Sequence, residues 1–136
     1  MSTKIKSISV ITARIVLGLI YFVFGLNFFF HFIPTPPPSG GVADAFTGGL
    51  FQSGYFFPML KGLEVALGGL LLLSLFVPLV LVVLMPISIN ILLFHAFLAP
   101  DNTIMGIVIV LLQIYLAWSY RDYYKPLFAP KTSITL

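Results

Sequence analysis

Residues 77–98 read VPLVLVVLMPISINILLFHAFL, and this stretch decides the fold. It contains no Lys, Arg, Asp or Glu. A helix that crosses a bilayer needs about 20 mainly apolar residues, with about 17 as the lower limit. The stretch therefore predicts a transmembrane helix. Pro78 falls in its first turn, where proline is tolerated because the missing N–H would have no partner there.

Three further segments meet the same criterion, and we expect each of them to cross the membrane. They run from about Ile8 to Ile33, from Phe56 to Leu75 and from Ile104 to Tyr120. A proline-rich break follows the first segment, because proline cannot continue a helix. Beyond that break, Val42 to Ser53 reads as a short amphipathic helix at the outer membrane surface. The prediction is an all-α, integral membrane bundle of four transmembrane helices.

The composition agrees with a membrane protein. The 136 residues are 60% hydrophobic and only 8% charged, whereas soluble domains carry about 25% charged residues. The length fits a single domain over residues 1–136. The absence of cysteine excludes disulfides, thiol catalysis and Cys-ligated metals. No basic patch interleaved with aromatic residues is present, so we expect the lipid bilayer, and no nucleic acid, as a partner.

The basic residues predict the orientation. Six of the seven Lys and Arg residues lie near the two ends of the chain, and only Lys61 lies between. Basic residues near helix ends mark the cytoplasmic side. With an even number of spans, both termini are expected there. The proline-rich segment and the loop that carries Asp101 are then expected to face outward.

Polar side chains inside the expected spans point to a site, because an ionisable group near the bilayer centre costs at least about 2.5–3.5 kcal/mol. At about 1.5 Å of rise per residue, all but one of them fall in the outer half. The exception is Arg14, which can snorkel toward the inner headgroups. We expect a polar pocket open to the outer face, with residues 42–53 as its lid. Its candidate ligand-binding residues are Glu64 at the centre, Lys61, Asn90, Gln113 and Asn27 around it, and His31 and His95 near the mouth.

Simpler interpretations of these residues remain open. Asn and Gln often hold membrane helices together by hydrogen bonds. Lys61 and Glu64 are three residues apart and can form an ion pair within one helix. The two histidines could ligate a haem or, with Glu64, a metal ion, but no attachment motif accompanies them and the depths differ. Gly18, Gly25, Gly62, Gly68 and Gly69 are typical of close helix packing, with a dimer face as the alternative.

Several short motifs, in their order and spacing, resemble the DoxX family of small bacterial membrane proteins. The resemblance covers nearly the whole chain. It rests on Ala13-Arg14, Gly18, Phe24-Gly25-Leu26-Asn27, Ser53-Gly54-Tyr55, the Lys61 to Glu64 helix, Phe76-Val77-Pro78-Leu79, the run from Asn90 to His95, and the run from Tyr115 to Arg121.

The resemblance implies a four-helix bundle in the bacterial cytoplasmic membrane. The family takes its name from a subunit linked to thiosulfate:quinone oxidoreductase. Our hypothesis is therefore a redox-associated membrane subunit that binds a quinone or similar amphiphile, with Glu64 and His95 handling protons and Asn90 and Gln113 bonding a carbonyl. The chain supplies no redox centre of its own, so a membrane or periplasmic redox partner is expected, and oligomers remain open. The alternative is a structural or assembly protein without a ligand.

Overall fold

The computed structural model describes residues 2–135, and over this range the chain is all-α, with five α-helices and no β-strand. This confirms the predicted fold class. The α-helices are α1 (Thr3–Phe30), α2 (Val42–Gln52), α3 (Phe56–Leu72), α4 (Val77–Phe97) and α5 (Thr103–Ser119). Short 3-10 turns occupy Pro100–Asn102, Arg121–Tyr123 and Lys125–Phe128.

Helix length and hydropathy make this a small multi-pass membrane protein. The helices α1 and α4, and α5 together with the turn before it, are each long and apolar enough to cross a bilayer. The fourth candidate span is the bent pair of α2 and α3 taken together. Within this pair, α3 alone has 17 residues, which is about the lower limit for a crossing. It follows α2 after a bend of 91°. Apolar side chains such as Ile8, Leu19, Leu79 and Leu111 cover the outside of the bundle.

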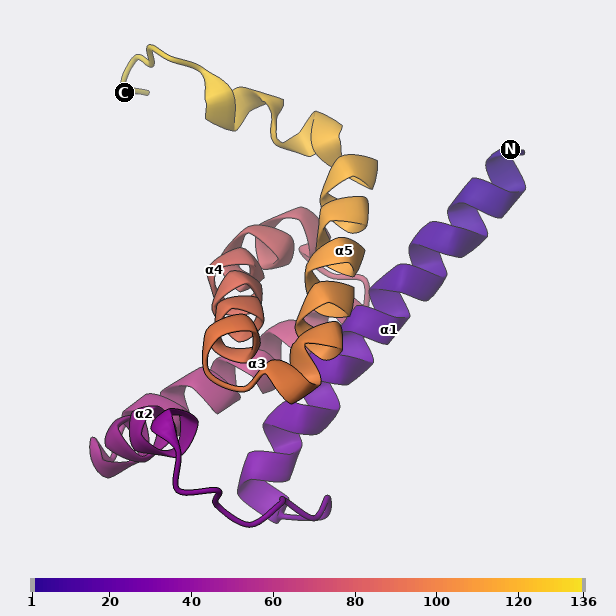
Figure 1. Cartoon of the computed structure of the whole chain (residues 1–136). Coiled ribbons are helices and arrows are strands. Elements are labelled where there is room, and N and C mark those ends of the chain that lie inside the picture. The colour runs from indigo at the N-terminus through magenta and orange to yellow at the C-terminus, as the bar shows by residue number, and fades with distance from the viewer. Residues whose placement is uncertain (1, 136) are drawn as a thin grey trace.

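Figure 1 shows how the helices are arranged. Both termini lie toward one end of the bundle, whereas α2 and the connection from α4 to α5 lie toward the other. The most extensive packing joins α1 to α3 and α4 to α5. This arrangement places the interfacial helix beside the first half of α3 and the last half of α4.

Glycines allow α1 and α3 to approach closely. A Cβ atom at Gly68 would lie 2.6 Å from the backbone nitrogen of Phe22, and one at Gly25 would lie 3.2 Å from the Lys61 carbonyl oxygen. Gly18 faces Leu71 and Leu72 in the same interface. Small residues thus bring the helix backbones together, as the sequence predicts. Gly62 differs, because no atom lies within 4 Å of its Cβ position.

Two helices have ends that differ from those expected by three residues or more, whereas the ends of the others agree to within one residue. The first begins at Thr3, not Ile8, because the Ser2 hydroxyl accepts a hydrogen bond from the Ile5 N–H at 3.3 Å and caps it. It ends at Phe30, not Ile33, because His31 adopts a left-handed conformation with φ of 52°. The end of α3 falls at Leu72 rather than Leu75. The N–H of Leu75 there bonds back to the Leu70 carbonyl at 2.9 Å, and Ser74 takes a φ of 58°.

The interfacial helix α2 ends at Gln52, one residue before the expected Ser53, and begins where predicted. Its first turn is closed by Asp44, whose Oδ2 accepts hydrogen bonds from the Gly40 N–H at 2.6 Å and the Ser39 hydroxyl at 3.0 Å. Asp44 lies outside the spanning helices. These bonds hold its pKa below the usual value, the Gly40 bond contributing most. The carboxylate therefore stays charged and stabilises the N-terminus of α2.

Candidate functional site

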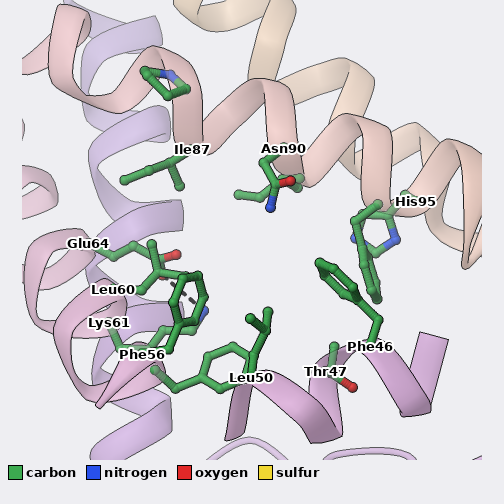
Figure 2. Close-up of a pocket in the computed structure, with 14 residues that line it drawn as sticks. Phe46, Thr47, Leu50, Phe56, Leu60, Lys61, Glu64, Ile87, Asn90 and His95 are labelled. Carbon is green, nitrogen blue, oxygen red and sulfur yellow. Dashed lines mark hydrogen bonds and ion pairs between the residues drawn. The ribbon is translucent and has the colours of Figure 1, made fainter. Parts of the chain in front are cut away.

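A cavity of about 410 Å³ lies between α2, the first half of α3 and the second half of α4. Figure 2 shows that α2 closes one side of it, which is the position expected of the predicted lid. Its polar side chains are Lys61 and Glu64 from α3 and Asn90 and His95 from α4, with Thr47 from α2. Aromatic and aliphatic side chains form the rest of the wall, among them Phe46, Leu50, Phe56, Ile87 and Phe94.

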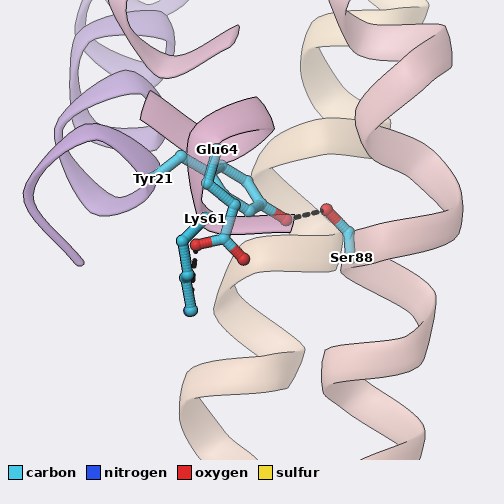
Figure 3. A network of polar contacts seen from close by, with 4 residues as sticks. All are labelled: Tyr21, Lys61, Glu64 and Ser88. Atoms are coloured by element: carbon cyan, nitrogen blue, oxygen red, sulfur yellow. Dashed lines mark hydrogen bonds and ion pairs between the residues drawn. The ribbon is translucent and has the colours of Figure 1, made fainter. Parts of the chain in front are cut away.

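Glu64 and Lys61 form an ion pair at one side of this cavity. The Lys61 ammonium donates to Glu64 Oε2 at 3.0 Å, across one turn of α3 (Figure 3). Glu64 is only 3% exposed. A carboxylate taken out of water is costly unless it is paired, so Lys61 makes the burial of Glu64 tolerable. The pair also places one charge of each sign at the cavity wall.

Asn90 and His95 bring free hydrogen-bonding groups to the opposite side. Within residues 2–135, no hydrogen bond engages the Asn90 side chain, and His95 Nδ1 is buried without a partner. Figure 2 shows the Asn90 carboxamide directed into the cavity. For His95, a buried polar atom without a hydrogen bond costs several kcal/mol in an apolar medium, whereas Asn90 is an exposed residue whose amide borders the cavity. These groups are therefore available to bond a molecule in the cavity.

Three of the seven candidate residues lie outside the cavity. Gln113, expected beside Glu64, is fully buried and donates from Nε2 to the Leu81 carbonyl at 2.7 Å, which ties α5 to α4. The side chain of Asn27 accepts from the Ile33 N–H at 2.7 Å and closes the end of α1. His31 is the exposed left-handed residue at that same end. These positions share the depth of the cavity but point in other directions.

Two residues that the sequence did not single out complete a buried network. The Ser88 hydroxyl bonds the Tyr21 hydroxyl (Figure 3). It also donates to Gln113 Oε1, so the network links α1, α4 and α5. Because the one proton of Ser88 goes to Gln113, the Tyr21 hydroxyl is the donor to Ser88. In the sequence, Tyr21 lies on the same helix face as Gly18 and Gly25, which pack against α3. This spacing indicated that its side chain would be buried.

Arg14 also differs from its expected position. Its guanidinium is buried and donates to the carbonyl oxygens of Leu71 and, at 3.2 Å, Leu72. The last carbonyls of a helix have no partner within that helix, and a positive charge there is favourable. Arg14 therefore caps the C-terminus of α3 and does not snorkel toward the headgroups.

No family model, curated protein or solved structure matches this chain. The resemblance to DoxX proteins therefore stays a prediction. In the part of the chain that the structure describes, no three His, Asp or Glu side chains group closely enough to hold a metal ion.

The cavity can bind a molecule that has an apolar body and a few hydrogen-bond acceptors. Donors come from the Asn90 carboxamide, the His95 ring and the Lys61 ammonium, which lie on two facing walls. Glu64 and His95 are groups that can accept or release protons there. The volume lies within the range of about 300–1,000 Å³ that small-molecule sites occupy.

Proposed function

We propose that this membrane protein binds a quinone or a similar amphiphile in the cavity between α2, α3 and α4, as a DoxX-like, redox-associated subunit. The observation that carries the proposal is the pair of unpartnered polar side chains, Asn90 and His95, facing the 410 Å³ cavity beside the Lys61 and Glu64 pair. Most of the remaining wall is apolar, which suits a flat ring.

The chemistry of a quinone suits these residues. A quinone ring offers two carbonyl acceptors on opposite edges, and the cavity offers donors from both α3 and α4. Asn90 would bond one carbonyl and the Lys61 ammonium the other, while the ring packs against apolar side chains such as Ile87. Glu64 and His95 would hold protons near the ring. A membrane or periplasmic partner would exchange electrons with the bound quinone.

We also propose that the protein lies in a bacterial cytoplasmic membrane with both termini in the cytoplasm. The basic residues at the two ends of the chain support this orientation. The two termini also lie toward one end of the bundle in Figure 1, as an even number of crossings requires. The cavity then lies in the half of the bundle nearer the outer face.

Replacement of Asn90 by Leu tests the proposed function. The variant keeps the size of the side chain but removes its donor, so we expect the affinity for a tail-less ubiquinone headgroup to fall about tenfold. The measurement is the headgroup retained by the protein in nanodiscs, above that retained by nanodiscs without protein.

Asn27→Leu is the matched control, because Asn27 caps α1 outside the cavity. It should lower the melting temperature and leave the affinity unchanged. Equal affinities for Asn90→Leu and the unmodified protein would remove Asn90 from the site. If the unmodified protein retains no headgroup at all, the quinone proposal is wrong.

A second function class has support of its own. The Tyr21, Ser88 and Gln113 network and the Arg14 cap use their polar groups entirely to join helices. These contacts between helices are sufficient for a structural or assembly protein, which needs no bound ligand. In that case Asn90→Leu would leave stability nearly unchanged, because Asn90 is exposed and its side chain makes no hydrogen bond that could be lost, and no variant would change quinone retention.

A further inference from the structure

A second cavity lies on the other side of the Lys61 and Glu64 pair. It has a volume of about 250 Å³ and is bounded by α1, α3, α4 and α5. Four residues line both cavities, namely Lys61 and Glu64 from α3 and Ile91 and His95 from α4. These side chains therefore border both spaces, and the way from one to the other runs between α3 and α4.

The size of the second cavity suits an extension better than a separate site. Its volume lies below the range of about 300–1,000 Å³ for small-molecule sites, whereas the first cavity falls inside that range. A single molecule could occupy both, with its larger polar part in the first cavity.

The chemistry of the second cavity differs from that of the first. Away from the four shared residues, it is lined by Ile20, Tyr21, Phe24, Met105 and Ile109. The one polar group in this set, the Tyr21 hydroxyl, is already bonded to Ser88. No free side-chain donor remains on this part of the wall, and the rest of it is apolar, so it fits an apolar chain.

The outer rim of the second cavity faces the surface that lipid covers. Phe24 on α1 and Met105 on α5 line it, and each is 43% exposed. A chain lying in the cavity can therefore continue between α1 and α5 into the acyl region of the bilayer.

From this geometry we infer that the ligand is a long-tailed amphiphile, whose headgroup lies in the cavity between α2, α3 and α4 and whose apolar tail passes through the second cavity to leave between α1 and α5. The inference rests on the proposed function, and it adds the substrate class and the path of the tail. It makes Phe24 and Met105 tail-binding residues and Asn90 a headgroup-binding residue.

Met105→Trp fills the second cavity and tests this path. Two probes are compared in nanodiscs, decylubiquinone and the same ubiquinone headgroup without a tail. The indole and the tail would compete for the same space, and this overlap should lower the affinity for decylubiquinone about tenfold. The affinity for the tail-less headgroup should not change.

Met59→Trp is the matched control, because Met59 is an exposed apolar residue of α3 that lines neither cavity. It should bind both probes as the unmodified protein does. Phe24→Trp narrows the same cavity from α1 and should repeat the selective loss, which guards against a folding defect specific to Met105→Trp.

The outcomes separate the inference from the proposed function. If the unmodified protein retains neither probe, both are wrong. If it retains the headgroup but Met105→Trp and Phe24→Trp leave decylubiquinone binding unchanged, only the tail path is wrong. If both variants weaken the two probes equally, the second cavity does not discriminate the tail, and the inference is again wrong.

Discussion

At the scale of single residues, the polar side chains of the spanning helices fall into two groups. Arg14, Ser88 and Gln113 find partners on neighbouring helices, whereas Asn90 and His95 face a cavity. The depth of each along its helix could be predicted from the sequence, because depth follows from residue count. The direction around the helix axis could not, since these helices are apolar on nearly every face.

Gly68 is the residue whose substitution we expect to be most damaging in the α1–α3 interface. In Gly68→Ala, the new Cβ would lie 2.6 Å from the Phe22 nitrogen and 2.9 Å from the Gly18 carbonyl oxygen. Relief of this overlap requires backbone movement, so the free energy of unfolding should fall by about 1–3 kcal/mol. An SDS titration in mixed micelles measures it.

Gly62→Ala is the matched substitution on the same helix, where the added atom meets open space. Alanine is a better helix former than glycine, so this variant should be more stable by about 0.5–1 kcal/mol. Similar losses for Gly62→Ala and Gly68→Ala would contradict the close approach at Gly68.

At the scale of elements, the sequence located every α-helix but misplaced three ends by three residues or more, both ends of α1 and the last residue of α3. The leucine run Leu70–Leu73 contains no residue that stops a helix, so α3 was expected to continue. It ends because Ser74 turns into the left-handed region and Arg14, distant in sequence, caps the last carbonyls. For α1, hydropathy marked the apolar segment, whereas the helix itself continues back through Lys4 and Lys6.

Ser74→Gly should stabilise the end of α3. Serine at a φ of 58° pays a left-handed penalty of about 1–2 kcal/mol, and glycine removes it. The greater entropy of glycine in the unfolded chain costs about 0.5–1 kcal/mol. The net gain in the free energy of unfolding should be about 0.5–1 kcal/mol.

Ser53→Gly provides the contrast. Ser53 has an ordinary φ of −60°, and its hydroxyl donates to the Leu50 carbonyl and accepts from the Phe56 N–H. This variant should lose stability. A destabilised Ser74→Gly variant would mean that the turn after α3 does not strain Ser74.

At the scale of the whole molecule, the cysteine-free sequence makes the proposed topology directly testable. Asp101→Cys should react with a membrane-impermeant maleimide in intact cells, because its loop is expected to face outward. Thr3→Cys and Lys131→Cys should react only after the membrane is permeabilised. The reverse pattern would invert the orientation, and labelling of Thr3→Cys and Lys131→Cys from opposite sides would exclude an even number of crossings.

The cavity itself was predictable only in part. Placing Glu64, Lys61, Asn90 and His95 in the outer half of the bundle led to the expectation of a shared pocket, and these four do line one. The second cavity was not foreseen, because its lining residues, such as Ile20 and Met105, are indistinguishable in sequence from lipid-facing ones. That space arises from the way α1, α3, α4 and α5 pack together.

The unequal lengths of α1 and α3 bear on the surrounding lipid. With 28 residues, α1 measures about 42 Å, whereas the 17 residues of α3 reach only about 25 Å. A hydrocarbon layer of about 30 Å is too thin for one and too thick for the other. We expect the long helix to tilt and the bilayer to thin beside the short one. Water and phosphate groups would then approach Glu64 from that flank, at a distance that the acyl-chain length of the host membrane helps to set.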